Sequence, residues 1–309
     1  MLFSKTSAGM EISTTGVKCA LVGGTRSAPR VVQVAHAPFP ENTLRVSLRE
    51  QNVLDSELFV ERIRAVHNLL LSSSDRVAVT LPDSVGRVLL LDFEGRFKSR
   101  VEALDLIRWK LKKSIPFDIE DTHLDYQQLS VRDNGDLAIL VALVSRAVIS
   151  QYEELVVKAG LSPYRIDFNV FNICRCFDRH LSGVDNGILV YLYGSTLGVM
   201  AFSDGVPEFM RIKDVSGASA LDSRMFRELN SSLLVYREKF PEKNSPSLFS
   251  MAAPDVSLAF QEMVAEATGT LPLMLETKTE VTPGNSAPGD QATLFTYTAA
   301  IGAALRGLR

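Results

Sequence analysis

The side chains that most often carry chemistry are scattered along this sequence. None of the four histidines belongs to a spacing such as His-x₃-His that would hold a metal ion: His36, His67, His123 and His180. Cys174 and Cys176 lie in an apolar helical stretch, where a free thiol behaves as a small hydrophobic side chain. With Cys19 they make an odd count, which fits neither a disulfide framework nor a zinc site. We therefore expect no metal site, and buried, reduced thiols of a cytosolic protein.

Other arrangements that could carry catalysis are equally weak. No Ser-x-x-Lys pair stands in the strand-to-helix context that such a nucleophile needs, so we expect no catalytic residues. One acidic segment follows Phe117 and contains four carboxylates: Asp118, Glu120, Asp121 and Asp125. Such a run is usually a solvated face, and the alternative is that it meets a basic peptide from a partner.

Composition sets the broad class of the protein. Of its 309 residues, 46% are hydrophobic and 22% are charged, which is the profile of a soluble globular protein of about two domains. The net charge is −3 and the pI about 5.9, so there is no global positive field to hold a nucleic acid. No run of about 18 apolar residues and no signal-peptide segment occurs. We therefore expect no direct membrane insertion, and membrane association only through a partner.

The first half of the chain combines strands with amphipathic helices. Apolar residues at near-helical spacing predict a helix over Asp55–Leu71. A second helix, Arg100–Ser114, is terminated by Ile115-Pro116-Phe117, and its apolar stripe consists of Val101, Leu104, Ile107 and Leu111. Asn134-Gly135 is typical of a hairpin turn. The other elements expected here are strands at Met10–Leu21, Arg30–His36, Arg76–Leu81, Arg87–Leu91, Leu124–Leu129 and Leu137–Val144, and a helix at Ala147–Ala159.

The second half restarts with consecutive strands. Turns at Gly194-Ser195 and Asp204-Gly205 separate three of them. The segment Glu280–Asp290 is rich in proline, glycine and asparagine and is expected to be a loop. The elements expected in this half are strands at Gly187–Tyr193, Leu197–Phe202, Pro207–Ile212, Ser247–Met251 and Leu271–Leu275, and helices at Ala218–Phe240, Val256–Thr268 and Thr293–Leu308.

Three stretches of the sequence are similar to one known family. The first is LPDSVGRVLLLDFEG with EALDLIRWKLKKSIPFDIEDTHLDYQQL, within Leu81–Leu129. The second is AILVALVSRAVISQYEELVVKAGLSPYRIDF, at Ala138–Phe168. The third consists of FRELNSSLLVYREKFP at Phe226–Pro241 and AIGAALRGL at Ala300–Leu308. In order and spacing they resemble the PilM family of type IV pilus assembly proteins, which are actin-like proteins related to the division protein FtsA.

The resemblance implies an α/β, actin-like (FtsA/PilM-like) fold of two domains with a central cleft and a rearranged inserted subdomain. We expect domain 1 over residues 1–185, with the inserted subdomain at about 42–130, and domain 2 over residues 186–309. The terminal helix, about 293–308, should pack back on domain 1. The similar element patterns of the two halves permit this arrangement without selecting it.

The resemblance also implies a partner. Members of the family bind the short cytoplasmic N-terminal segment of PilN, an inner-membrane pilus protein, and work with other pilus platform proteins. We expect this chain to bind such a peptide between its first and inserted subdomains, at the cytoplasmic face of the inner membrane. The expected pocket walls are Ile115, Phe117 and Tyr126, with the alternative that Ile115 and Phe117 belong to the core. The residues expected to pair with acids of the peptide are Arg108, Lys112 and Lys113.

The first nucleotide loop departs from the family pattern. Actin-like ATPases hold phosphates between two β-hairpins that each carry an acid and a glycine. The glycine lets backbone N–H groups approach the phosphates, and the acid orients the water shell of Mg²⁺. In the matching segment Glu11 replaces the aspartate and Ser13 replaces the glycine, and Gly16 is the residue that would compensate. The residues expected at this remnant of an ATP site are Glu11, Ser13, Thr14, Gly16 and Lys18.

The other two loops depart further. Tyr191 and Tyr193 stand where the family has aspartate and glycine, and an aromatic side chain cannot carry the water shell of Mg²⁺. A register shift that brings Gly194 and Ser195 into place still supplies no acid. The adenine-side loop contains no glycine, Pro254 removes a backbone donor from it, and its small residues are Ala252 and Ala253.

Several functions stay open at this point. The leading one is a peptide-binding scaffold without ATP hydrolysis and with no certain cofactor. Alternatives are weak binding of ATP and Mg²⁺ without turnover, and an active actin-like ATPase with unusual loops. A further alternative is the cytoplasmic actin-like component of a type II secretion platform. That domain is normally followed by a membrane helix, and this sequence contains none up to Arg309.

Overall fold

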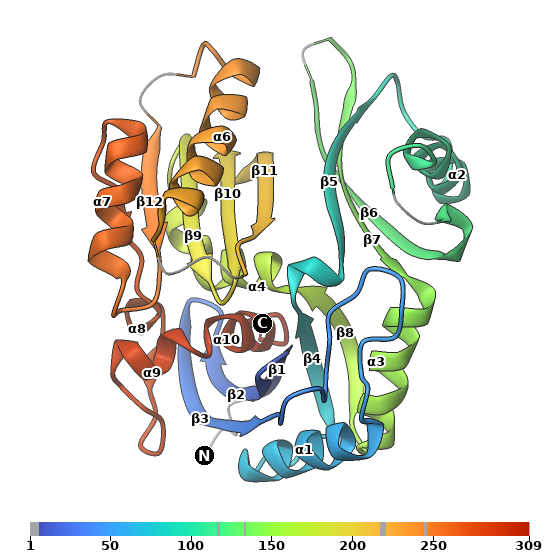
Figure 1. The fold of residues 1–309 in the computed structure, drawn as a ribbon, viewed down its shortest axis with the longest axis vertical. Coiled ribbons are helices and arrows are strands. Elements are labelled where there is room, and N and C mark those ends of the chain that lie inside the picture. The colour runs from blue at the N-terminus through green and yellow to red at the C-terminus, as the bar shows by residue number, and fades with distance from the viewer. Residues whose placement is uncertain (1–5, 116–117, 133, 217–220, 244–245, 309) are drawn as a thin grey trace.

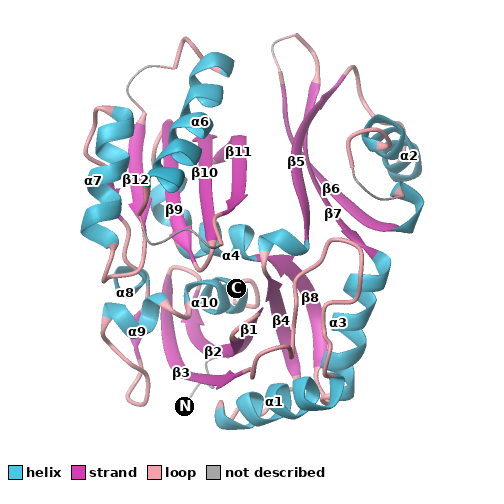
Figure 2. Cartoon of the chain, in the orientation of Figure 1, coloured by secondary structure: helices cyan, strands magenta, loops and turns pink. Residues whose placement is uncertain are grey.

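A computed structural model describes the chain over residues 6–115, 118–132, 134–216, 221–243 and 246–308. The described residues form three β-sheets with helices packed on their faces (Figure 1, Figure 2). Two of the sheets stand at opposite sides of the upper half of Figure 1, and the largest lies below both.

The first sheet contains six strands: β1 (Ser7–Ser13), β2 (Gly16–Thr25), β3 (Ala28–Pro38), β4 (Arg76–Leu81), β8 (Ser162–Phe168) and β14 (Thr282–Pro283). Their order is β14-β3-β2-β1-β4-β8. Two hairpins make β1, β2 and β3 antiparallel neighbours, whereas β4 runs parallel to both β1 and β8. Residues of β1 are buried on both faces, as expected of a strand that has helices above and below it.

Four helices pack on this sheet: α1 (Ser56–Leu69), α3 (Arg146–Lys158), α4 (Asn169–Cys176) and α10 (Thr298–Leu305). α10 lies against β1, β2, β4 and α4, and α1 lies against β2, β3 and α3. Two glycines allow the close approach of α10. A Cβ added to Gly9 would lie 2.0 Å from the carbonyl oxygen of Ala300, and one added to Gly302 would lie 1.8 Å from that of Asn172.

The second sheet belongs to the second half of the chain. Its strands are β9 (Asn186–Tyr193), β10 (Thr196–Ser203), β11 (Val206–Asp214), β12 (Ser247–Met251) and β13 (Leu273–Met274), in the order β11-β10-β9-β12-β13. α6 (Ser223–Lys239) and α7 (Ser257–Thr268) pack on one face around a separate core. Side chains of the other face, including Tyr191, Met200 and Phe249, join the core of the first sheet. The two halves therefore share one continuous hydrophobic core.

The third sheet is a smaller unit with its own core. It consists of β5 (Gly86–Phe93), β6 (Thr122–Val131) and β7 (Leu137–Ser145) in the order β5-β7-β6, with α2 (Arg100–Leu111) on one face. Ser99 caps α2, because its hydroxyl accepts a hydrogen bond from the backbone N–H of Glu102 at 3.2 Å. Ile107 and Leu111 of α2 pack on Val141 and Leu143 of β7.

Five short helical segments complete the described chain: η1 (Asp83–Val85), η2 (Ile119–Asp121), α5 (Asp178–Leu181), α8 (Thr277–Glu280) and α9 (Gln291–Phe295). Several elements differ from the sequence-based expectation. The inserted unit was expected at about 42–130, but the third sheet runs from Gly86 to Ser145. Within the expected range, β4 is instead a strand of the first sheet, and α1 packs on that sheet. The expected terminal helix is divided into α9 and α10 at Thr296 and Tyr297.

The apolar stripe of α2 is also shifted from the expected one. Val101 is 70% exposed, and Ala103 takes its place in the buried face. α6 begins at Ser223 rather than at residue 218, and residues 217–220 lie outside the described residues.

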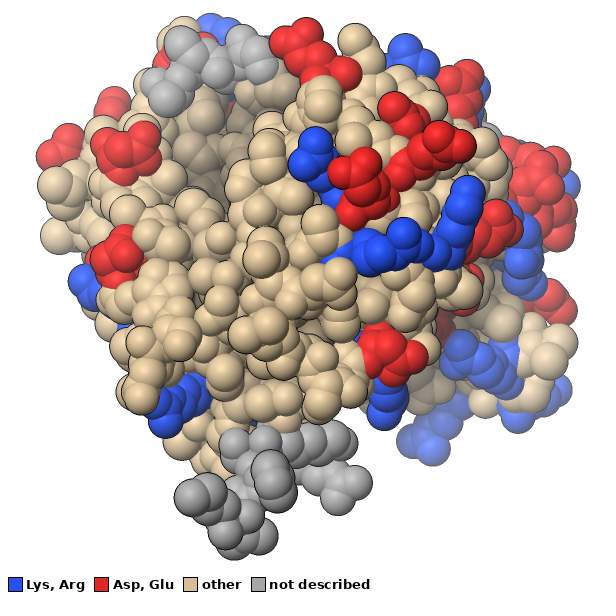
Figure 3. Space-filling model, turned by 90° about the horizontal axis from the view of Figure 1, so that it is seen from below, with Lys and Arg blue, Asp and Glu red and all other residues tan. Residues whose placement is uncertain are grey.

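Charged side chains of both signs share the surface. In the view from below, Lys and Arg side chains lie directly beside Asp and Glu side chains, and a broad central area is uncharged (Figure 3). On this face, therefore, the basic side chains do not form a patch of a single sign.

Candidate functional site

The ends of two hairpins, one from each half of the chain, are joined by a hydrogen bond. Ser13 pairs with Gly16 in the β1–β2 hairpin, and Tyr193 pairs with Thr196 in the β9–β10 hairpin, so each turn has two residues. The Tyr193 hydroxyl donates to Oε2 of Glu11 at 2.7 Å. The sequence analysis placed both residues at nucleotide loops, and the structure brings these two loops together.

Burial dominates the electrostatics of this bond. It raises the pKa of the Glu11 carboxyl, while the Lys18 ammonium on the neighbouring strand and the Tyr193 hydroxyl act in the opposite direction. Burial, followed by the Glu11 charge, holds the pKa of Tyr193 well above its usual value. Tyr193 therefore keeps its proton at neutral pH and acts as the donor.

Tyr191 fills space where a small residue would leave a gap. Its fully buried ring lies over Gly198 on the adjacent strand β10, and a Cβ on Gly198 would come within 2.1 Å of that ring. The Tyr191 hydroxyl makes no hydrogen bond to any described residue. At the position where the resemblance predicts an aspartate, Tyr191 thus presents a packed ring.

A second buried carboxyl lies near these tyrosines. Asp83 of η1 accepts a hydrogen bond from the backbone N–H of Val170 at 2.9 Å and so caps the N-terminus of α4. Burial raises the pKa of Asp83 to about 7, and the Glu11 charge adds to this shift. Burial, followed by the charge of Asp83, holds the pKa of Tyr191 well above its usual value.

The remaining predicted loop residues lie around the two turns or in the core. Thr14, Gly194 and Ser195 are exposed at the turns, while Lys18 is half-buried on β2. The Ser13 hydroxyl donates a hydrogen bond to the Gly16 carbonyl at 3.1 Å, so this hydroxyl is engaged within its own turn. Ala252 is buried in the core of the second sheet and Ala253 packs half-buried against the shared core.

A cavity of about 840 Å³ lies between the two halves, and we refer to it as the interdomain cleft. Its walls come from the segment before α1, from η1 and β5, and from β10 and β11: Val46, Ser47, Leu48, Arg49, Asp83, Ser84, Gly86, Arg87, Val88, Thr196, Ile212, Lys213 and Asp214. Outside the residues that line this cavity, Arg132 bonds Asp92 at 3.0 Å and lies 3.7 Å from Glu208 of β11, which also pairs with Lys243. We call Arg132 and Glu208 the rim pair. An ion pair therefore links the third sheet to the second.

A groove runs between the first and third sheets. It consists of two adjoining depressions of about 410 and 310 Å³, which share five lining residues: Asp125, Ala142, Arg165, Asp167 and Phe171. We call it the subdomain groove. Its charged walls are already organised, since Arg306 bonds Asp167 at 2.9 Å and Arg100 bonds Asp125 at 2.6 Å.

The residues predicted to bind a peptide are dispersed. Tyr126 lines the smaller depression, where its ring packs edge-to-face against Phe97 and lies under the Arg100 guanidinium. Ile115 packs half-buried on the core of the third sheet, while Phe117 lies outside the described residues. Arg108 pairs with Asp105 on α2, and Lys112 and Lys113 are exposed at the end of that helix. None of these last three lines the groove.

Sequence reasoning missed most of the groove. Phe171 and Arg165 lie within or beside an apolar stretch, where nothing local distinguishes a groove wall from the core. The sequence signal that could have located this groove is the alternation of core and groove residues along β6 and β7. His123, Asp125 and Gln127 alternate with the core residue Leu124, and Leu140 and Ala142 alternate with Val141, which marks a second face on this sheet.

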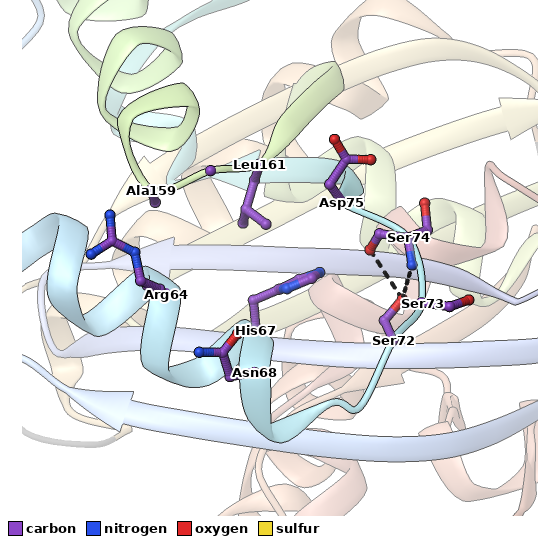
Figure 4. A pocket seen from close by; sticks show the side chains of 10 residues that line it. Arg64, His67, Asn68, Ser72, Ser73, Ser74, Asp75, Ala159 and Leu161 are labelled. Atoms are coloured by element: carbon purple, nitrogen blue, oxygen red, sulfur yellow. Dashed lines mark hydrogen bonds between the residues drawn. The ribbon is translucent and has the colours of Figure 1, made fainter.

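A separate polar depression lies where α1 and α3 end. His67 of α1 points toward the Ser72–Asp75 loop, whose Ser72 hydroxyl bonds the backbone of Ser74 (Figure 4). Burial lowers the pKa of His67. The loop hydroxyls are used within the loop, and among the described residues no three His, Cys, Asp or Glu side chains gather to hold a metal. This depression therefore gives no indication of a metal centre.

Comparison with known proteins identifies the family. Residues 9–191, more than half of the chain, match the family model described as type IV pilus assembly protein PilM. The chain belongs to the PilM family. No curated protein matches the sequence of this PilM-family chain.

Solved structures place the PilM-family chain in the actin-like fold. The structure of a PilM–PilN type IV pilus biogenesis complex superposes with a TM-score of 0.79 at 18% identity, covering 98% of both chains. The cytoplasmic domain of EpsL, an inner-membrane component of the type II secretion system of Vibrio cholerae, gives a TM-score of 0.53 at 12% identity, with 96% of this chain and 95% of that chain covered. The expected actin-like α/β fold is thus confirmed, and family membership favours the pilus over the secretion alternative.

Proposed function

We propose that this PilM-family protein is a scaffold of the type IV pilus inner-membrane platform that binds the cytoplasmic N-terminal peptide of a PilN-like membrane protein. The observation that carries the proposal is the subdomain groove, which is a preformed depression between the first and third sheets. The similarity to a structure titled a PilM–PilN complex adds to it, because that relative assembles with PilN.

The groove has the chemistry of an extended-peptide site. β6 is an edge strand of the third sheet, and its consecutive residues Asp125, Tyr126 and Gln127 line the smaller depression. A strand edge offers unpaired backbone N–H and C=O groups, to which an extended peptide can add. Phe171 and Ala142 supply apolar wall, while Arg146 and Glu153 supply charges of both signs.

We also propose that the protein does not hydrolyse ATP. Tyr193 and Tyr191 take the places of the glycine and the acid in the second hairpin, and the Tyr193 hydroxyl engages the carboxyl that would otherwise order Mg²⁺. We expect no Mg²⁺-dependent phosphate release from ATP. Turnover above a protein-free blank that disappears in Glu11→Ala would instead establish the active-ATPase alternative.

Membrane association follows from the partner in this proposal. In the described part of the chain, no helix is long and apolar enough to cross a bilayer. A PilN-like protein would hold this cytoplasmic scaffold at the inner membrane, where other platform proteins would join it.

The test measures affinity for a synthetic peptide of the cytoplasmic N-terminus of the PilN-like protein from the same organism. Phe171→Ala and Arg146→Glu change the groove, and matched changes are Trp109→Ala on the exposed face of α2 and Lys113→Glu just after that helix. We expect the groove variants to bind about tenfold more weakly, which corresponds to about 1.4 kcal/mol, and the α2 variants to bind within about twofold of wild type.

Melting temperatures of all four variants separate binding from folding. A weakened affinity at unchanged melting temperature supports the groove. If instead Lys113→Glu weakens binding and Arg146→Glu does not, the peptide binds at α2, where the sequence analysis placed its basic contacts.

A further inference from the structure

Tyr193 reaches from the second sheet into a socket built by the first half of the chain and its C-terminal return. Its hydroxyl donates to Glu11 at 2.7 Å and lies 3.2 Å from the carbonyl oxygen of Thr296. Its ring packs against that of Phe295, with centroids 5.5 Å apart. One side chain of the second sheet therefore contacts three residues of the part of the chain that faces it across the cleft: Glu11, Phe295 and Thr296.

The socket makes opening of the cleft costly. Glu11 is 3% and Tyr193 is 6% exposed, so their bond is sheltered from water. Separating them inside the protein would leave a buried hydroxyl and a buried carboxyl unpaired, which is penalised more heavily than the bond itself is rewarded. If the cleft opens, water must therefore enter to bond the Tyr193 hydroxyl and the Glu11 carboxyl, or the two groups stay unpaired at a cost in free energy.

The surroundings of the bond are also built for closure. Tyr191 and Tyr193 of the same strand β9 are both buried, and the Tyr193 hydroxyl bonds a carboxyl of the first half. The other titratable groups that act on this site are Lys18, beside Glu11, and the buried thiols of Cys174 and Cys176. Lys18 brings a positive charge to Glu11, and the guanidinium groups of Arg175 and Arg306 act on Cys174.

From these contacts we infer that Tyr193 is a latch that holds the interdomain cleft closed in the absence of nucleotide. In a nucleotide-dependent relative of this fold, bound phosphates and Mg²⁺ would lie between the two hairpins and connect them. Here the tyrosine connects them directly, so the closed arrangement is a property of the chain itself. The inference concerns the relation of the two halves and needs no peptide in the subdomain groove.

The experiment measures the distance across the cleft in solution. Nitroxide labels are attached at Ser130→Cys on the third sheet and Ser231→Cys on α6, both exposed positions on opposite sides of the cleft. Protein without the introduced cysteines, carrying Cys19, Cys174 and Cys176, serves as the labelling blank. We expect one narrow distance distribution in the latch-intact protein, unchanged by Mg-ATP, and a broader distribution shifted to longer distances in Tyr193→Phe.

The matched control is Tyr152→Phe. Tyr152 is another buried tyrosine, whose hydroxyl accepts a hydrogen bond from the Asn52 amide at 3.2 Å entirely within the first half. This control should lose stability as Tyr193→Phe does but keep the wild-type distance. A folded Tyr193→Phe protein with an unchanged distribution, or an equal shift in Tyr152→Phe, overturns the latch. Hydrogen exchange at residues 194–196 gives a second readout, expected to accelerate only in Tyr193→Phe.

Discussion

Two tyrosines of one strand have separate roles at the residue scale. Tyr193 ends β9 and uses its hydroxyl, because Glu11 lies within hydrogen-bond distance. Tyr191 contributes its ring, which packs directly against residue 198 of the neighbouring strand. Only glycine, which has no Cβ, fits at position 198 beside this ring. Glycine at position 198 is therefore required by packing rather than by its backbone angles.

The sequence could predict that these loops were altered but not what replaced their chemistry. The replacement of an acid by Tyr191 and of a glycine by Tyr193 is visible in the sequence alone. The bond from Tyr193 to Glu11 joins residues 182 positions apart, and no local pattern encodes such a contact. A residue comparison therefore detects a lost site more readily than a new interaction.

Asp83 should make stability depend on pH. Its folded pKa of about 7 lies above its ordinary value of 3.8, so the folded state retains a proton that the unfolded state releases. The resulting penalty is absent below about pH 4, grows as pH rises to about 7, and is constant above that. We expect Asp83→Asn to gain stability relative to wild type over this range, by up to about 4 kcal/mol, as measured by urea unfolding.

The amide oxygen of asparagine can still accept the Val170 N–H, so the cap of α4 is retained in this variant. Asp255→Asn, at an exposed position, is the control and should track wild type at every pH. A difference between Asp83→Asn and wild type that is flat from pH 4 to 8 would show that Asp83 does not retain the proton.

At the element scale, periodicity located most helices but not the parts that depend on tertiary contact. The expected helix Ala147–Ala159 corresponds to α3 at Arg146–Lys158. The segment 280–290 has loop composition, yet Thr282 and Pro283 form β14 because they pair with Arg30 and Val31 of β3. The third sheet includes Leu137–Ser145, beyond the expected end of the insertion, because β7 pairs with both β5 and β6. The partner with which a strand pairs cannot be predicted from the residues of that strand alone.

One side chain holds the segment before α1 against α3. Oε1 of Gln151 accepts the backbone N–H groups of Asn52 and Val53 at 2.7 and 2.9 Å, and its Nε2 donates to the Val53 carbonyl at 2.8 Å. Gln151→Ala would leave these buried backbone groups unpaired, so we expect a loss of about 2–3 kcal/mol. Hydrogen exchange at residues 52–54 should accelerate locally in this variant.

Gln151→Glu provides the matched comparison, because a carboxylate keeps the two acceptor contacts but cannot donate to Val53. Exchange at residues 52 and 53 should stay slower in Gln151→Glu than in Gln151→Ala. Equal exchange in wild type and Gln151→Ala would mean that the segment is held by other contacts.

At the scale of the whole molecule, the groove and the cleft are products of assembly. The groove walls come from β6, β7, α3, β8, α4 and the residue Arg306, which are brought together only by the packing of two sheets. The family resemblance implied a peptide groove between two subdomains, and its expected basic contacts Arg108, Lys112 and Lys113 do not line the depression found between the first and third sheets. The peptide site itself stays a prediction, and of its expected residues that the structure describes, Tyr126 lies in the groove lining.

Two interactions connect the two sides of the cleft, and they differ in their exposure to water. Tyr193 and Glu11 form a bond sheltered from water, whereas Arg132 and Glu208 are partly exposed, with 27% and 19% of their side-chain surfaces accessible. Salt screens an exposed pair far more than a buried one. The interaction between Arg132 and Glu208 should therefore weaken as ionic strength rises, whereas the hydrogen bond between Tyr193 and Glu11 should not.

The rim pair can be measured with a double-mutant cycle of Arg132→Ala and Glu208→Ala. At 3.7 Å and with partial exposure, we expect a coupling free energy of about 0.5–1 kcal/mol in low salt, falling toward zero near 1 M salt. The cycle for Glu11→Gln and Tyr193→Phe, run in parallel, should keep its coupling across the same range because the Debye length matters little to buried groups. Asp92 and Lys243 also contact this pair, so each is left unchanged in all variants. A rim coupling that persists undiminished at high salt would mean that Arg132 links the sheets through packing of its stem and not through its charge.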